Sequence, residues 1–259
     1  MNTLHTKRKE TQCPQTKKLY IENLILEVTR KCNMSCAHCM QGNAEELDLS
    51  FSTIQPLLDR LDGIGTITFT GGEPTLHIPV MKEILNYCRE KEIPIYNFYI
   101  VTNGKQISDE FLLFLLHLYQ YCYEHNDEVN EFSGLALSKD DFHEPIPSKN
   151  QALLSAFTFY HPQEKANNFT KVPIVPTGRA LLLPNDVYNV LDHIPDTYIP
   201  DITEFDDNIS INDGDCYITA KGDITFNCNT SYQVEDETAT YTCQDIPAFL
   251  QALSHLANE

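Results

Sequence analysis

Residues 23–39 read NLILEVTRKCNMSCAHC, an apolar run followed directly by three cysteines. The run at 23–29 has the length and the branched apolar content of a buried strand. Cys32, Cys36 and Cys39 follow within eight residues, so a loop after the strand brings three thiols within reach of one centre. A [4Fe-4S] cube takes four thiolates, and three leave one iron open to another ligand. The stretch therefore predicts an iron–sulfur site with an open coordination position.

Strand-like and helix-like runs continue to alternate after this stretch, as in βα units that build a parallel sheet. Strands are expected at 66–70, 95–102 and 134–138, near 171–175, and at 209–211. Helices are expected at 50–61, with Ser50 as N-cap, and at 78–92, 109–125 and 148–160. A hairpin at 216–228 around Lys221 and Gly222 and a short helix from about Ile246 follow.

Acidic residues dominate the charge, with 37 Asp and Glu against 18 Lys and Arg and a net charge of −19. This balance repels phosphate backbones, so nucleic acid is not an expected partner. The N-terminus lacks the apolar core of a signal peptide, and the most apolar stretch, residues 111–118, is too short to cross a bilayer. Nine cysteines suit thiolate ligands in a reducing compartment. We therefore expect a cytoplasmic protein without a membrane segment.

The spacing C-x3-C-x2-C after the first strand resembles the signature of the radical S-adenosylmethionine (SAM) superfamily. In that family the open iron chelates SAM, an electron from the reduced cluster breaks the sulfonium C–S bond, and the 5′-deoxyadenosyl radical takes a hydrogen atom from the substrate. The resemblance implies Cys32, Cys36 and Cys39 as ligands of a [4Fe-4S] cluster and SAM as the second cofactor. The alternative for the triplet is a zinc site completed by His38 or a distant cysteine.

The resemblance also implies an α/β fold, a partial (βα)6 barrel open on one side with a short C-terminal β-hairpin and helix. We expect a flexible N-terminal arm at 1–20, because this segment has little apolar surface to offset the entropy of ordering. A radical SAM core would then span 21–205, and a C-terminal extension with the hairpin and helix would span 206–259.

Several further residues resemble family positions around SAM. Gly71, Gly72 and Glu73 resemble the GGE segment whose backbone bonds the SAM amino group, and a branched side chain at Gly72 is expected to weaken SAM binding while leaving the cluster in place. His38 would lie beside the adenine of SAM, and Thr102 and Asn103 near its nucleoside. Ser138 and Asp140 would contact the ribose hydroxyls, and Arg179 would bond the carboxylate or the ribose. For each of these side chains taken alone, the alternative to SAM binding is an ordinary structural role in a turn, at a helix cap or on the surface. His143 is a candidate catalytic residue because histidine titrates near neutrality, with an ordinary loop histidine as the alternative.

Cys216, Cys228 and Cys243 resemble in part the cysteine-bearing extension that holds auxiliary [4Fe-4S] clusters in many peptide-modifying relatives. Three cysteines fall short of the four ligands of a closed cluster, so Asp215 or an open iron would have to complete it. We therefore expect one cluster, about four irons per chain, and a hairpin without metal. A second cluster at these cysteines is the alternative.

Three features favour hydrogen abstraction from a ribosomally made peptide or an amino-acid-like substrate: the Gly-Arg-Ala segment at 178–180, the loop SKDDFH at 138–143, and the cysteine hairpin. The expected partners are a peptide or small-molecule substrate, a reductant such as flavodoxin or ferredoxin, and a separate protein that recognises a leader peptide. Two alternatives are an activase of a glycyl-radical enzyme and, from a different class, a non-catalytic metal-binding or electron-transfer protein.

Overall fold

A computed structural model describes residues 17–126, 134–162, 173–184, 186–190 and 200–258. The strands are β1 (Lys18–Thr29), β2 (Leu61–Gly71), β3 (Ile95–Thr102), β4 (Gly134–Leu137), β5 (Pro173–Ile174), β6 (Asn189–Val190), β7 (Ile202–Phe205), β8 (Asn208–Ile218), β9 (Asp223–Thr225) and β10 (Tyr241–Thr242). The helices are α1 (Phe51–Leu58), α2 (Ile78–Glu90), α3 (Asp109–His125), α5 (Ser148–Leu154), α6 (Tyr232–Thr238) and α7 (Ile246–Leu256), and short 3-10 turns are η2 (Pro74–Leu76), η3 (Gly178–Leu182) and η4 (Cys243–Asp245).

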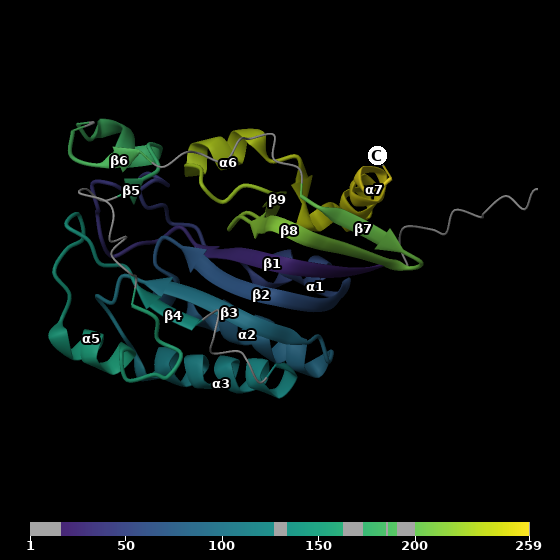
Figure 1. Cartoon of the computed structure of the whole chain (residues 1–259), viewed down its shortest axis with the longest axis horizontal. Coiled ribbons are helices and arrows are strands. Elements are labelled where there is room, and N and C mark those ends of the chain that lie inside the picture. The colour runs from purple at the N-terminus through teal and green to yellow at the C-terminus, as the bar shows by residue number, and fades with distance from the viewer. Residues whose placement is uncertain (1–16, 127–133, 163–172, 185, 191–199, 259) are drawn as a thin grey trace, which may run out of the picture.

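One open, mostly parallel sheet organises the fold (Figure 1). Its strand order is β10-β9-β8-β1-β2-β3-β4, with β7 paired to β8 off this path. β1 lies between β2 and β8 and is parallel to both, and β3 and β4 extend the parallel run. β5 and β6 form a separate two-stranded sheet. The described strands therefore build an open α/β sheet of the kind expected, in which β1 to β4 follow one another to one edge.

The predicted elements are largely confirmed, and most differences lie at their ends. The strand expected at 209–211 and the first strand of the hairpin are, however, one strand, β8. β3 and α3 have the predicted bounds, and Ser50 caps α1 by accepting a hydrogen bond from the backbone of Thr53. α1 ends at Leu58 rather than at 61, because Leu61 already pairs with Leu19 in the sheet. α5 ends at Leu154 rather than at 160, and turns follow it.

The N-terminal arm was predicted too long, because β1 begins at Lys18 and its first residues pair with β8. The rest of that prediction, residues 1–16, lies outside the described residues, as do residues 171 and 172 of the strand expected near 171–175.

The C-terminal segment belongs to the central sheet. β8 and β9 form the predicted hairpin, with Ile218 opposite Ile224 and Gly222 at a φ of +88° in the turn. β8 also runs beside β1, so the hairpin continues the sheet instead of standing apart from it. The division of the chain at residue 205 stays a prediction.

The central sheet has two different faces because successive side chains of a strand point to opposite sides. One face is apolar: Leu24, Ile67 and Phe98 are fully buried in a core to which α1, α2, α3 and α7 also contribute. The other face carries polar side chains such as Thr66 and Thr68, which line a cavity of about 490 Å³. The apolar stretch at 111–118 lies within α3. Within the described ranges, no helix has both the length and the apolar content that a membrane crossing requires.

Candidate active site

The three cysteines of the loop after β1 line one cavity. Cys32, Cys36 and Cys39 are each partly exposed there, and the backbone N–H of Cys39 donates to the carbonyl of Cys36 across 3.2 Å. We call this space, of about 200 Å³, the cysteine cavity. Burial raises the pKa of the Cys32 and Cys36 thiols above the ordinary value, so thiolates at these positions need a nearby cation. Bound iron provides such a charge, and the donor set therefore fits an iron–sulfur cluster.

The end of β2 forms a second wall of the cysteine cavity. Gly71 and Gly72 line it, and they also pack tightly against the loop that carries the cysteines. A Cβ atom at Gly72 would lie 2.3 Å from the carbonyl oxygen of Lys31, and one at Gly71 would lie 2.1 Å from that of Thr29. The expectation that Gly72 leaves room mainly for a ligand is therefore corrected. The absence of a side chain at Gly72 allows the end of β2 to pack against the backbone of Lys31.

Glu73 joins the ends of β2 and β3. Its buried carboxylate accepts hydrogen bonds from the Thr102 hydroxyl at 2.7 Å, from the Asn103 backbone at 2.8 Å and from the Thr75 hydroxyl at 2.6 Å. Burial raises the pKa of Glu73, although these hydrogen bonds lower it. Glu73 and Asn103 line the cysteine cavity, whereas Thr102, fully buried, does not lie among its described lining residues. Thr102 therefore supports the wall of this cavity from behind.

The loop after β4 brings a carboxylate between two histidines. Asp140 contacts Nε2 of His38 at 3.1 Å and Nδ1 of His143 at 2.8 Å. One ring nitrogen of each histidine and one oxygen of Asp140 lie within 4.8 Å of one another. Burial alone would raise the pKa of Asp140, but the close contacts with His143 and His38 hold it well below its usual range. Ser138, His38 and His143 line the cysteine cavity, and Asp140 is not among its described lining residues. The structure thus gathers the four predicted residues at one rim.

The Gly-Arg-Ala segment docks onto the cysteine loop. The backbone N–H of Arg179 donates to the carbonyl of Cys39 across 2.9 Å, and the hydroxyl of Thr177 donates to the carbonyl of Met40. Gly178 has a φ of +55°, and a Cβ atom there would lie 2.2 Å from the Met40 carbonyl oxygen. Arg179 lines the cysteine cavity. The segment therefore closes this cavity from a part of the chain about 140 residues away.

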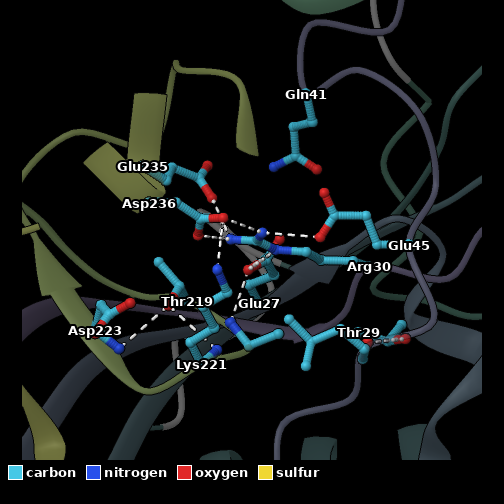
Figure 2. A network of polar contacts seen from close by, with 12 residues as sticks. Glu27, Thr29, Arg30, Gln41, Glu45, Thr219, Lys221, Asp223, Glu235 and Asp236 are labelled. Carbon is cyan, nitrogen blue, oxygen red and sulfur yellow. Dashed lines mark hydrogen bonds and ion pairs between the residues drawn. The ribbon is translucent and has the colours of Figure 1, made fainter. Parts of the chain in front are cut away.

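Sequence reasoning missed a buried network around Arg30, two residues before the first cysteine (Figure 2). The Arg30 side chain is fully buried and contacts Asp236 at 2.9 Å, Glu45 at 3.0 Å, Glu27 at 3.2 Å and Glu235 at 3.3 Å. Glu27 and Arg30 come from β1 and the residue after it, whereas Glu235 and Asp236 come from α6. An arginine beside a cysteine motif gives no sequence signal for partners 205 residues away.

The same network ties the C-terminal segment to the cysteine loop. Tyr232 lies with its ring 4.4 Å from the Arg30 guanidinium and also lines the cysteine cavity. Lys221 contacts Asp236 at 2.6 Å, so two cations face the four carboxylates of Glu27, Glu45, Glu235 and Asp236. Burial raises the pKa of Glu27 to about 7 and that of Glu235 to about 8, in spite of Arg30. The network therefore retains a proton near neutral pH.

The three C-terminal cysteines lie on opposite faces of the sheet. Cys216 of β8 and Cys243 are fully buried in the apolar core. Asp215, the neighbour of Cys216 in β8, lines the cavity on the other face, where the Cys228 thiol donates to its carboxylate across 3.1 Å. Because adjacent residues of a strand point to opposite sides, the sheet separates Cys228 from Cys216 and Cys243. This arrangement supports the prediction of one cluster.

We expect anaerobically reconstituted protein to contain about four irons per chain, because the sheet separates Cys228 from Cys216 and Cys243 and the three thiols offer no common centre for a second cube. The variant Cys216→Ala, Cys228→Ala, Cys243→Ala should keep the same iron content in a colorimetric iron assay. Iron near eight per chain in the parent, falling to about four in the variant, would instead establish a second cluster.

Part of the chain matches a known protein family. The model described as "Radical SAM superfamily" matches residues 26–122. Uncharacterized protein MJ0907 of Methanocaldococcus jannaschii is 37% identical over 94 residues, which are 35% of this chain and 33% of that protein. The S-adenosylmethionine-dependent nucleotide dehydratase of Selenomonas ruminantium is 33% identical over 82 residues, 30% of this chain and 28% of that protein.

Mycofactocin maturase MftC of Mycobacterium ulcerans is 30% identical over 91 residues, 34% of this chain and 24% of that protein. The chain thus covers about a third or less of the length of these three relatives. Among solved structures, SuiB of Streptococcus suis bound to the precursor peptide SuiA is similar with a TM-score of 0.39 and 14% identity, over 86% of this chain and 62% of that chain.

Proposed function

We propose that this protein, whose residues 26–122 match the model of the radical SAM superfamily, cleaves SAM reductively and abstracts a hydrogen atom from a peptide or amino-acid-like substrate. One observation carries the proposal. Cys32, Cys36 and Cys39 line a single cavity that Gly71 and Gly72 at the end of β2 also line. Three thiols leave one iron of a cube open, and the end of β2 lies at the same cavity.

A [4Fe-4S] cluster bound by the three cysteines would supply the electron that breaks the sulfonium C–S bond of SAM. The residues of the chain then have to bind and orient SAM. The backbone carbonyls at the end of β2 suit its amino group, which donates hydrogen bonds, and the Arg179 guanidinium suits its carboxylate. Asp140, ionised between His38 and His143, suits the ribose hydroxyls. If a ribose hydroxyl of SAM replaced one of the two histidine contacts of Asp140, the carboxylate would accept a hydrogen bond from that hydroxyl.

A second cavity supports a substrate rich in hydrogen-bonding groups. This sheet cavity, of about 490 Å³, lies on the polar face of the central sheet and shares Gln41, Thr70 and Val101 with the cysteine cavity. A substrate held there would therefore lie next to SAM. None of its described lining residues is a lysine or arginine, and a nucleotide phosphate would meet the carboxylate of Asp215. The lining thus favours a peptide or amino acid over a nucleotide.

The first test is reductive cleavage of SAM. Anaerobically reconstituted protein given dithionite and SAM should release 5′-deoxyadenosine and methionine, measured by liquid chromatography with mass detection. The variant Cys32→Ala, Cys36→Ala, Cys39→Ala should release no more than a protein-free blank. Cys122→Ala is the matched control, because Cys122 is buried within α3 and does not line the cysteine cavity. Equal 5′-deoxyadenosine from the parent and the triple variant would exclude the proposed function.

A further inference from the structure

The sheet cavity is lined by neutral residues, both apolar and polar, apart from Asp215. Asn23 of β1, Thr66 and Thr68 of β2 and Tyr99 of β3 all face it from neighbouring strands. Their amide and hydroxyl groups both donate and accept hydrogen bonds, so they suit many polar ligands equally. The neutral lining residues therefore do not select the charge of a ligand.

Asp215 is the one charged residue among the described residues that line the sheet cavity. Its contact there is the thiol of Cys228, which donates to the carboxylate across 3.1 Å. Burial and the charge of Asp215 raise the pKa of Cys228 to about 12, so this thiol stays protonated and neutral at physiological pH. The hydrogen bond satisfies one lone pair of the carboxylate but does not compensate its negative charge.

A ligand that fills the sheet cavity displaces the water that solvates Asp215. A buried carboxylate without a cationic partner is costly, so a neutral or anionic ligand would be penalised at this position. A ligand that carries a positive charge replaces the lost solvation with an ion pair. The net charge of −19 adds a long-range field of the same sign.

We infer that the sheet cavity binds a positively charged nitrogen of the substrate, a lysine or arginine side chain or a terminal ammonium group, with Asp215 as its counter-ion. This inference rests on the proposed function, because it assigns the substrate position of that reaction. It makes Asp215 a specificity-determining residue, and it places the charged nitrogen at Cys228, on the same face of the sheet as the cysteine cavity.

Cys228 allows a direct test, because its thiol reports which small molecules reach Asp215. Cluster-loaded protein is treated anaerobically with 2-aminoethyl, 2-hydroxyethyl or 2-sulfonatoethyl methanethiosulfonate, which carry a positive, neutral and negative charge. Modification of Cys228 is followed over time by peptide mass spectrometry. Comparing the reagents within one protein cancels any change in the reactivity of the thiol itself. We expect the cationic reagent to react about tenfold or more faster than the neutral one, and the anionic reagent to be slowest.

Asp215→Asn should bring the three rates within about twofold of one another, and Asp215→Glu should retain the preference for the cation. Asp213→Asn is the matched control, because Asp213 is an exposed acid of the same strand that does not line the cavity. Equal rates in the parent, or a preference that survives Asp215→Asn, would each overturn the inference. SAM cleavage is measured on the same samples, so a failure of the proposed function is seen separately from a failure of the charge preference.

Discussion

Arg30→Met is expected to lower the free energy of unfolding by about 3–5 kcal/mol, the cost of removing one partner from a buried ion pair. Methionine fills a similar volume but leaves Glu27 and Glu235, both fully buried, without their cation. Urea unfolding followed by far-UV circular dichroism measures the change. Because Arg30 also holds α6 against the cysteine loop, faster proteolysis of the segment at 219–245 is expected in the same variant.

Lys31→Met is the matched control for the loss of a positive charge beside Cys32. Lys31 is 35% exposed and pairs with Asp48 at the surface, so its loss should cost less than about 1 kcal/mol. A similar effect of the two substitutions would mean that the Arg30 network contributes no more than a surface ion pair.

The pH dependence of the unfolding free energy distinguishes the contribution of charge in the Arg30 network from the contribution of its packing. Burial raises the pKa of Glu27 to about 7 and of Glu235 to about 8 in the folded protein, above the ordinary value of 4.5. The folded state thus holds protons that the unfolded state releases, and the resulting stabilisation is lost as the pH rises through 7 and 8. Glu235→Gln keeps an oxygen for Arg30 but cannot ionise, so its unfolding free energy should fall less than that of the parent between pH 6 and pH 8.5.

Gly72→Ala is expected to reduce iron incorporation and SAM binding together and to lower the free energy of unfolding by about 3 kcal/mol. The added Cβ atom would lie 2.3 Å from the carbonyl oxygen of Lys31, so the loop that carries Cys32 has to move. Iron analysis, calorimetric titration with SAM and urea unfolding measure the three effects.

Gly63→Ala is the control, since the added Cβ atom would meet only the side chains of Pro94 and Tyr20, both at 3.3 Å. A Gly72→Ala variant that keeps four irons per chain and full stability but loses SAM would restore the simpler explanation, in which the glycine makes room for the ligand alone.

Local patterns were sufficient to predict the elements near the cysteines. The bounds of β3 and α3, the cap at Ser50 and the hairpin around Gly222 depend on periodicity, capping and turn chemistry, which act over a few residues. The end of α1 and the start of β1 were missed because they depend on pairing between Leu19 and Leu61, which lie 42 positions apart.

The sequence by itself determined which residues can carry the chemistry: three thiols at a spacing that suits one cluster, and a pair of glycines after the next strand. Only the tertiary structure decided how the other groups combine. It buries Arg30 among carboxylates from both ends of the chain, and it places Cys216 and Cys228 on opposite faces of β8 and its neighbours. Burial, ion pairing and the face of a sheet are set by contacts between distant segments, and spacing along the chain does not encode those contacts.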